Sequence, residues 1–389
     1  MSTDTSPVSP PLPAVLVARP ETAGLPLVAL PLLDRLLVAT HRAGFSPIVV
    51  VSDRPLPPLP RSSAWKIPFT HLPAIPSIQA PTLLASTDQH LTPADLRQLL
   101  PAGGRLVSSQ NTLLPAGIVT VTPPSPPRGS RGDETPSLPP PQPDPWSHLP
   151  HRKAGPVARP ITDATSAREA GEVLWASLNS SVDGAVDRWF NRPVGRRLLS
   201  RWLVHTVISP NQISCSATLI GVVAGFLFTL GSPPVAILAA VLFQISAIID
   251  CVDGDVARAV FKESPLGKWL DIVGDQVVHA AIFAGIAIGL WRSQPDGPYL
   301  WLGASAVLGG ILSFLVVLRG LRDPSRITGR LQALIDKATN RDFSVLVLIL
   351  ALFDRLGWFL WLTTFGSHAF WIIALTIQAN AHRSPVKTS

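Results

Sequence analysis

Long apolar runs fill the second half of the chain, from about Ile208 onward, whereas the first half has only short ones. A straight helix needs about 20 predominantly apolar residues to cross a bilayer. Six runs approach that length, although the last two are short and only a few polar residues around Asp354 separate them. We therefore predict an all-α core of six transmembrane helices in a membrane domain at residues 213–389. The predicted spans are residues 213–230, 235–258, 268–290, 299–318, 343–357 and 358–378.

The first part of the chain alternates short apolar runs with stretches of helical periodicity. This alternation is typical of an α/β layer fold with a parallel sheet. We therefore predict an N-terminal cytoplasmic α/β domain at residues 1–122. The predicted strands are residues 14–18, 47–51, 82–86 and 117–121, and the predicted helices are residues 30–43, ended by Gly44, and 93–100, capped by Thr92.

Two further segments separate this domain from the spans. Residues 123–160 hold 13 prolines in 38 residues, a composition typical of an extended linker. Residues 161–212 return to helical patterning and are predicted to form juxtamembrane helices. Within them, residues 182–202 place arginines such as Arg192 and Arg196 opposite apolar and tryptophan side chains, which predicts an amphipathic helix in the membrane interface.

The charge distribution indicates the partners and the orientation. The net charge of +7 is concentrated beside the apolar runs, so anionic membrane lipids are expected partners and nucleic acid is not. The loop from Arg319 to Arg341 carries six basic residues, whereas the opposite loops carry only Arg292 and Arg355. Basic loops remain on the cytoplasmic side. We therefore expect a multi-pass protein of a bacterial-type inner or plasma membrane, with both termini and the active site facing the cytoplasm.

An acidic stretch, DCVDGDVARAVFKESPLGKWLDIVGD, interrupts the apolar runs between Asp250 and Asp275. Ionisable groups at membrane depth are costly and mark functional sites. On helices, four of the aspartates fall on two faces that a short turn brings together. Four like charges require cations there, and a pair of hard divalent ions, Mg²⁺ or Mn²⁺, suits both carboxylates and displacement at phosphorus. The four residues are Asp250, Asp253, Asp271 and Asp275.

Small residues accompany these aspartates. Gly254 and Ala257 leave the same helical stripe bare of bulky side chains, so that a nucleotide could lie against the backbone. Arg258 follows on that face, either as a phosphate contact or as a structural partner of an aspartate. Asp255 lies about 140° around the helix from Asp250, and we expect it to be a solvated neighbour.

These residues carry a resemblance to a known family. The stretch matches D-x2-D-G-x2-A-R-x8-G-x3-D-x3-D, the signature of the CDP-alcohol phosphotransferase family, at every fixed position. The resemblance implies a six-helix membrane fold, a divalent-metal site built by the four aspartates, and Asp275 as general base. It also implies that Gly254, Ala257, Arg258 and Gly267 border the CDP moiety, and that a homodimer is common.

The start of the chain resembles, more faintly, a sugar-phosphate nucleotidyltransferase. The similar part is PLLDRLLVATHRAGFSPIVVV, followed by LLASTDQHL, in which Asp88 comes after a strand. The Gly-rich loop of such enzymes is replaced by ARPETAG, and Lys66 is the only lysine in the first 150 residues. We therefore predict a degenerate domain without cytidylyltransferase activity.

The function that the resemblance implies is transfer of a phosphoalcohol, such as a phosphatidyl group, from a CDP-alcohol to an acceptor alcohol or polyol phosphate, with release of CMP. Such a reaction belongs to phospholipid or polar-lipid biosynthesis. Arg319, Arg322 and Arg326 could hold an anionic acceptor or headgroup, or could simply reflect the positive-inside rule. The alternative function is an ion-coupled membrane transporter that uses the same intramembrane aspartates.

Overall fold

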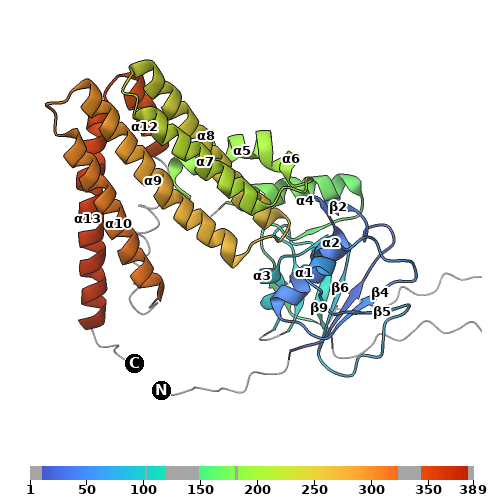
Figure 1. The fold of residues 1–389 in the computed structure, drawn as a ribbon. Helices are drawn as coiled ribbons and strands as arrows, with labels where there is room; N and C mark the ends of the chain where they lie inside the picture. The colour runs from blue at the N-terminus through green and yellow to red at the C-terminus, as the bar shows by residue number, and fades with distance from the viewer. Residues whose placement is uncertain (1–10, 101–102, 120–148, 180–182, 323–342, 384–389) are drawn as a thin grey trace, which may run out of the picture. The chain divides into compact units, whose positions relative to one another are not determined.

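The computed structural model describes residues 11–100, 103–119, 149–179, 183–322 and 343–383 of the 389-residue chain. The chain divides into two compact units, Met1–Ser177 and Leu178–Ser389 (Figure 1). All strands of the described part lie in the first unit, and the second unit is helical. The division therefore separates an α/β unit from a helical unit.

A seven-stranded sheet forms the centre of the first unit. Its strands are β1 (Ala14–Val17), β4 (Ile48–Val51), β5 (Thr70–Leu72), β6 (Thr82–Ser86), β8 (Arg105–Val107), β9 (Leu113–Val119) and β10 (His151–Lys153). They lie in the order β10-β8-β9-β6-β1-β4-β5. β1 pairs in parallel with β4 and β6, whereas β9 runs antiparallel to both β6 and β8. The sequence predicted a parallel sheet, but the sheet is mixed.

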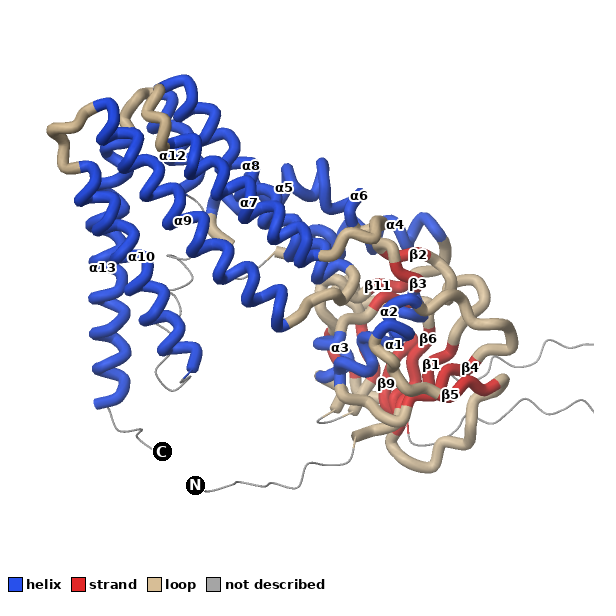
Figure 2. Tube along the Cα trace, viewed as in Figure 1, coloured by secondary structure: helices blue, strands red, loops and turns tan. Residues whose placement is uncertain are grey.

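The helices of this unit begin and end largely where the sequence predicts. Helix α1 (Leu32–Ala43) packs against the short helices α2 (Pro60–Ala64) and α3 (Pro93–Arg97) (Figure 2). It ends at Gly44, whose left-handed φ of 95° costs a glycine little. Thr92 caps α3 by accepting a hydrogen bond from the Asp95 N–H, as predicted.

The first unit continues well beyond residue 122, where the sequence placed its end. β10 pairs with β8, and β11 (Arg159–Pro160) pairs with β7 (Gln89–His90). Helix α4 (Ala164–Ser177) packs against β2 (Pro26–Leu27), which pairs with β3 (Leu30–Pro31). The predicted linker and juxtamembrane boundaries are therefore wrong over residues 151–177. These strands are too short to show apolar alternation within a proline-rich composition, and residues 120–148 lie outside the described part.

The second unit is a bundle of apolar helices. They are α7 (Pro210–Phe228), α8 (Pro233–Ala259), α9 (Pro265–Ser293), α10 (Tyr299–Arg322), α12 (Phe343–Leu352) and α13 (Leu356–Arg383). α7 packs against both α8 and α9, and α10 packs against α9 and α13. The contact between α7 and α9 depends on small residues: a Cβ on Gly285 would lie 2.0 Å from the carbonyl oxygen of Gly225. The backbones can approach this closely only without side chains.

Five helices in the described part of the chain, α7, α8, α9, α10 and α13, are long and apolar enough to cross a membrane. The fifth of the six predicted spans corresponds to α12, which has only ten residues. Phe343 of α12 packs against Phe243 of α8 and Phe359 of α13, with ring centroids 5.4 Å and 5.7 Å apart. The described core therefore contains six helices, of which five have spanning length.

A helical segment precedes the bundle and packs against α8. It runs from Asp187 to Leu203 through η1 (Asp187–Asn191), α5 (Arg192–Gly195), η2 (Arg196–Ser200) and α6 (Arg201–Leu203). Gly195 allows the close approach, because a Cβ there would lie 2.9 Å from Val252 Cγ2. Trp189 is 80% exposed and Trp202 63% exposed, whereas Arg192 is buried. The two tryptophans therefore share the exposed side of the segment with Arg188, Arg197 and Arg201, whereas Arg192, which was predicted to lie on the basic face, is buried.

Candidate active site

The candidate site lies where α8 ends and α9 begins. Ser264 caps α9, because its Oγ accepts a hydrogen bond of 3.0 Å from the Gly267 N–H, and Pro265 takes the first helical position. The turn between the helices is short, since α8 ends at Ala259. The acidic stretch thus folds into two helix ends joined by a turn, as the sequence predicts.

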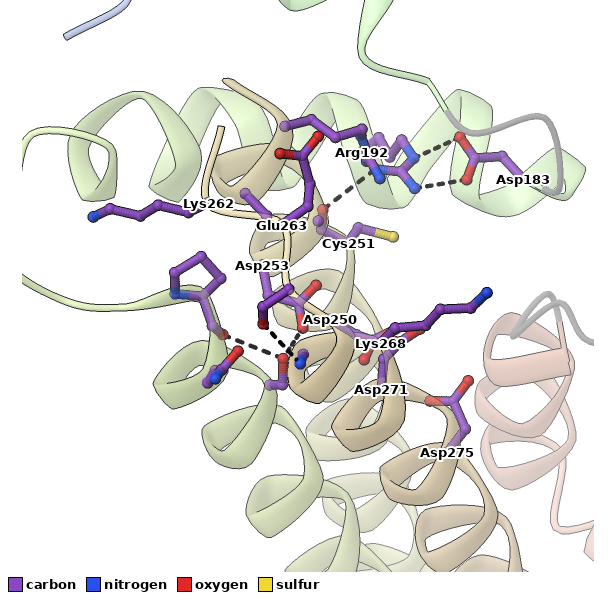
Figure 3. A pocket seen from close by; sticks show the side chains of 18 of the residues that line it. Asp183, Arg192, Asp250, Cys251, Asp253, Lys262, Glu263, Lys268, Asp271 and Asp275 are labelled. Atoms are coloured by element: carbon purple, nitrogen blue, oxygen red, sulfur yellow. Dashed lines mark hydrogen bonds and ion pairs between the residues drawn. The ribbon is translucent and has the colours of Figure 1, made fainter. Parts of the chain in front are cut away.

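Three of the four predicted aspartates come together at this junction. Asp250 of α8 and Asp271 and Asp275 of α9 each place a carboxylate oxygen so that all three oxygens lie within 4.8 Å of one another (Figure 3). Like charges at this separation destabilise one another unless a cation is bound or a proton is taken up. Oxygen donors at this spacing match the coordination preferences of Mg²⁺ and Mn²⁺.

Asp253 lies in the same pocket but outside this group of three. Its side chain is buried, and its Oδ2 accepts a hydrogen bond from Ser214 Oγ of α7. The same Ser214 Oγ lies 3.2 Å from the carbonyl oxygen of Pro210, in the first turn of α7. The start of α7 therefore orients Asp253, a contact that no pattern in the sequence indicates.

A pocket of about 470 Å³ surrounds these carboxylates, a volume in the range of small-molecule sites. The four residues expected to border the CDP moiety, Gly254, Ala257, Arg258 and Gly267, all line it. Protein side chains cover the two glycines, however. A Cβ on Gly254 would lie 3.1 Å from Arg258 Nη1, and one on Gly267 would lie 2.9 Å from Asn211 Oδ1. The clearance at these glycines therefore accommodates neighbouring side chains.

Asp88, the acidic residue singled out in the first unit, follows β6 at the carboxyl end of the parallel strands. Its Oδ1 accepts a hydrogen bond of 2.9 Å from Thr22 Oγ1, and its Oδ2 accepts one of 3.0 Å from Ser86 Oγ. Arg19 Nε lies 3.4 Å from the same Oδ2. β1 lies between β6 and β4, so this is the position in the sheet where α/β folds commonly bind ligands. Here side chains of the chain itself bind the Asp88 carboxylate.

The family model described as CDP-alcohol phosphatidyltransferase matches residues 207–378. Residues 207–378 form a CDP-alcohol phosphatidyltransferase domain. The match covers α7 to α9 with the whole acidic stretch, and extends into α13. The first unit lies outside the matched residues, so the family assignment applies to the helical unit.

Two relatives of the chain come from Thermococcus kodakarensis and Pyrococcus horikoshii. The bifunctional IPC transferase and DIPP synthase of Thermococcus kodakarensis is 29% identical over 153 residues, which are 39% of this chain and 34% of that protein. The archaetidylinositol phosphate synthase of Pyrococcus horikoshii is 35% identical over 91 residues, which are 23% of this chain and 47% of that protein. The chain thus spans between about a third and a half of the length of these relatives.

A solved structure also resembles the chain. It is the Mycobacterium tuberculosis phosphatidylinositol phosphate synthase in complex with manganese and citrate. The similarity covers 51% of this chain and 92% of that one, with 18% sequence identity and a TM-score of 0.36.

The prediction that Asp255 is a solvated neighbour is wrong. Asp255 is 1% exposed, and its carboxylate meets three arginines. Arg192 Nη1 lies 2.7 Å from Oδ1, Arg196 Nε lies 2.6 Å from Oδ2, and Arg258 Nη2 lies 3.1 Å from Oδ1. The face of α8 opposite the pocket aspartates is covered by the segment that carries Arg192 and Arg196, which the sequence assigned to the membrane interface.

Arg192 is a pocket residue that the sequence analysis missed. Its Nε and Nη2 donate to the carboxylate of Asp183 at 2.5 Å and 2.7 Å (Figure 3). Its Nη1 donates to Asp255. Burial works against ionisation of Arg192, but its hydrogen bonds to Asp183 and the nearby carboxylates raise its pKa above the usual value. The spacing of Arg192 and Arg196 by four residues, on a helix that also carries buried apolar residues, was the available signal.

Of the three arginines predicted to hold an acceptor or headgroup, only Arg319 has a described side chain. Arg319 is exposed near the end of α10 and does not line the pocket. The side chain of Arg322 and the whole of Arg326 lie outside the described residues. Their role therefore stays a prediction.

Proposed function

We propose that this protein is an integral-membrane CDP-alcohol phosphotransferase, which transfers a phosphoalcohol group from a CDP-alcohol to an acceptor hydroxyl and releases CMP. The convergence of Asp250, Asp271 and Asp275 within 4.8 Å carries the proposal, because it lies in a pocket of the matched transferase domain. The pocket also holds Arg258, a cation suited to a diphosphate.

The carboxylates fit a divalent metal site. Asp250, Asp271 and Asp275 would hold Mg²⁺ or Mn²⁺, since hard oxygen donors suit both ions. We expect two ions, with Asp253 contributing because it lines the same pocket. When bound, these ions would neutralise charge on the transferring phosphoryl group and on the departing phosphate.

The chain's own side chains have separate tasks in this reaction. Asp275, one turn along α9 from Asp271, would accept the proton of the acceptor hydroxyl. The acceptor oxygen forms a bond to the phosphorus that carries the alcohol, and the bond from that phosphorus to the CMP oxygen breaks. Arg258 would donate to a donor phosphate, and Ala257 would lie along the CDP moiety. Gly254 and Gly267 would leave room beside it for the side chains of Arg258 and Asn211.

The membrane arrangement that we propose has six spans, an interfacial helix, and a cytoplasmic active site with cytoplasmic termini. The exposed side chains of Trp189, Leu198 and Trp202 support the interfacial helix, since such side chains favour the headgroup region. The six basic residues between Arg319 and Arg341 support the orientation. The proposed fifth span is the predicted one at residues 343–357, which includes α12.

The substrates that we propose follow the chemistry of the domain and of its relatives. The donor is CDP-diacylglycerol or another CDP-alcohol, and the acceptor is an alcohol or a polyol phosphate. The names of the two relatives, which include an archaetidylinositol phosphate synthase, support a polar lipid as product. Arg319, Arg322 and Arg326 are proposed to hold the anionic acceptor or a lipid headgroup. A homodimer is the proposed assembly.

The test is CMP release by purified protein. CDP-diacylglycerol and a soluble CDP-polyol would each be offered with a panel of alcohols and polyol phosphates, with Mg²⁺ or with EDTA. We expect CMP to appear only with metal and with a matching pair of substrates. Ion uptake into vesicles without CMP release from any pair would instead favour the transporter that uses the same aspartates.

A further inference from the structure

Arg258 lies flat over the backbone of α8 at the edge of the pocket. Two of its nitrogens are fixed: Nε donates to the Leu178 carbonyl oxygen at 3.1 Å, and Nη2 donates to Asp255 Oδ1 at 3.1 Å. A Cβ on Gly254 would lie 3.1–3.4 Å from Nη1, Nη2 and Cζ, so the guanidinium covers that glycine. Nη1 has no hydrogen-bond partner among the described residues, and the side chain is 32% exposed. One side of Arg258 is therefore held, and the other is available to a ligand.

Asp255, which holds Arg258, is itself fixed from the other side. Arg192 and Arg196 approach its two oxygens at 2.7 Å and 2.6 Å, and the side chain of Asp183 in turn pairs with Arg192. The side chains of Asp255, Arg192 and Asp183 are each at most 8% exposed. A carboxylate surrounded by three guanidinium groups in a poorly solvated place has few alternative positions. The orientation of Arg258 therefore depends on the segment that precedes the bundle.

We propose that Asp255 is a positioning residue for donor binding. It acts through Arg258, whose guanidinium it holds across Gly254 so that Nη1 meets a phosphate of the CDP moiety. The inference rests on the proposed function, because it takes the pocket to be the donor site. It also assigns a second role to Arg192 and Arg196, which hold Asp255 from the juxtamembrane segment and so couple that segment to the donor pocket.

A double-mutant cycle on the full-length protein tests this role. CDP binding is measured by calorimetry in the presence of Mn²⁺ for Asp255→Asn, Arg258→Gln and the double variant. If Asp255 acts through Arg258, each single substitution weakens CDP binding about tenfold, which corresponds to about 1.4 kcal/mol. The double variant is then also weakened about tenfold, because the second substitution removes nothing further. Binding of Mn²⁺ alone, followed by electron paramagnetic resonance, stays within about twofold, since the metal carboxylates are unchanged.

Arg292→Gln serves as the matched control. Its Nη1 donates to the Thr229 carbonyl oxygen at 2.8 Å, at the opposite end of α9, so CDP binding is expected to match the wild type. Should Asp255→Asn fail to purify as a folded protein, Asp255→Asn combined with Arg196→Gln removes one charge of each sign, and the same cycle is run with Arg258→Gln.

The outcomes separate this inference from the proposed function. A weakening of about a hundredfold in the double variant, or a parallel loss of Mn²⁺ affinity in Asp255→Asn, would overturn the positioning role. So would unchanged CDP binding in Asp255→Asn. Wild-type protein that does not bind CDP overturns the inference and the proposed function together. CDP binding that shows the expected cycle without CMP release from any donor overturns only the proposed function.

Discussion

The two units of the chain each carry acidic side chains where a ligand site could form, and they satisfy those side chains differently. In the first unit, Thr22 and Ser86 donate hydrogen bonds to Asp88, and Arg19 lies beside it. In the second unit, three carboxylates place their oxygens within 4.8 Å of one another. A carboxylate that its own chain neutralises has no need of a cation, whereas a group of like charges gains stability by binding one. The comparison favours the carboxylates of the second unit as the place where a cation would bind.

The largest difference in CMP release is expected between the variants Asp275→Asn and Asp88→Asn. Asparagine cannot accept the proton of the acceptor hydroxyl, so Asp275→Asn should reduce CMP release about 10²–10⁴-fold. Asp88→Asn should leave CMP release unchanged. Turnover near the wild-type rate in Asp275→Asn would show that the proton goes elsewhere. Loss of metal-dependent CDP binding in that variant would instead identify Asp275 chiefly as a metal ligand.

The metal site can be tested through a residue that does not itself bind the metal. Ser214 donates a hydrogen bond to Asp253, so Ser214→Ala should lower Mn²⁺ affinity about 10–100-fold, in the range found when a ligand loses its outer partner. Ser214→Thr keeps the hydroxyl and should retain most of the affinity. Electron paramagnetic resonance of bound Mn²⁺ measures both, and equal affinities in the wild type and the alanine variant would contradict the role of Asp253.

The donor side of the pocket is tested at Gly254. A Cβ there would lie 3.1 Å from Arg258 Nη1, so Gly254→Leu must displace the guanidinium. We expect CDP binding to weaken at least about tenfold, by the affinity scale in which 1.4 kcal/mol is tenfold. The helix should remain folded, since leucine favours a helix more than glycine does. Normal CDP affinity, measured by calorimetry in a variant with an unchanged melting temperature, would contradict this arrangement.

A smaller effect, on stability alone, is expected for a substitution in the first unit. Thr22→Val removes one hydrogen bond to Asp88, which should cost that unit about 0.5–1.5 kcal/mol. Hydrogen exchange at β1 and β6 measures the loss, and CMP release is expected to stay at the wild-type level. A fall in CMP release without a change in hydrogen exchange would show that this site contributes to the transfer reaction.

No nucleotidyltransferase activity is expected from the first unit. The first unit lacks the Gly-rich loop of nucleotidyltransferases and the basic residue of that loop. In addition, side chains of the unit donate hydrogen bonds to the Asp88 carboxylate. We therefore expect no pyrophosphate release from CTP with any sugar or polyol phosphate. Metal-dependent release that Asp88→Asn abolishes would reverse the contrast between the two units.

The features that the sequence predicts well are local. The Thr92 cap, the Gly44 helix end and the aspartates of α8 and α9 depend on residues within one or two helical turns, so periodicity and capping rules suffice. The sequence predicts four aspartates as one group because spacing fixes both helix faces, and three of them, Asp250, Asp271 and Asp275, place their oxygens within 4.8 Å of one another.

The features that escaped prediction depend on partners far apart in the chain. Asp255 is buried because Arg192 and Arg196 reach it from about 60 positions earlier, and no periodicity within α8 indicates them. The same reason applies to Ser214, which meets Asp253 from another helix. The length of α12 was also missed: the helix ends at Leu352, whereas the predicted span continued to residue 357, because an apolar run without caps does not show where a helix ends.

Because β10 lies in the sheet, the first unit contains two segments of the chain, one before and one after the proline-rich stretch. β10 and β11 come after the proline-rich stretch, yet they pair with β8 and β7, which come before it. A fragment that stops at residue 122 would turn β8 into an unpaired edge, and such edges promote aggregation. A protease that cut once between residues 123 and 148 would leave both pieces with their strand partners, so the nicked unit should stay assembled and should be recoverable by mixing the two fragments.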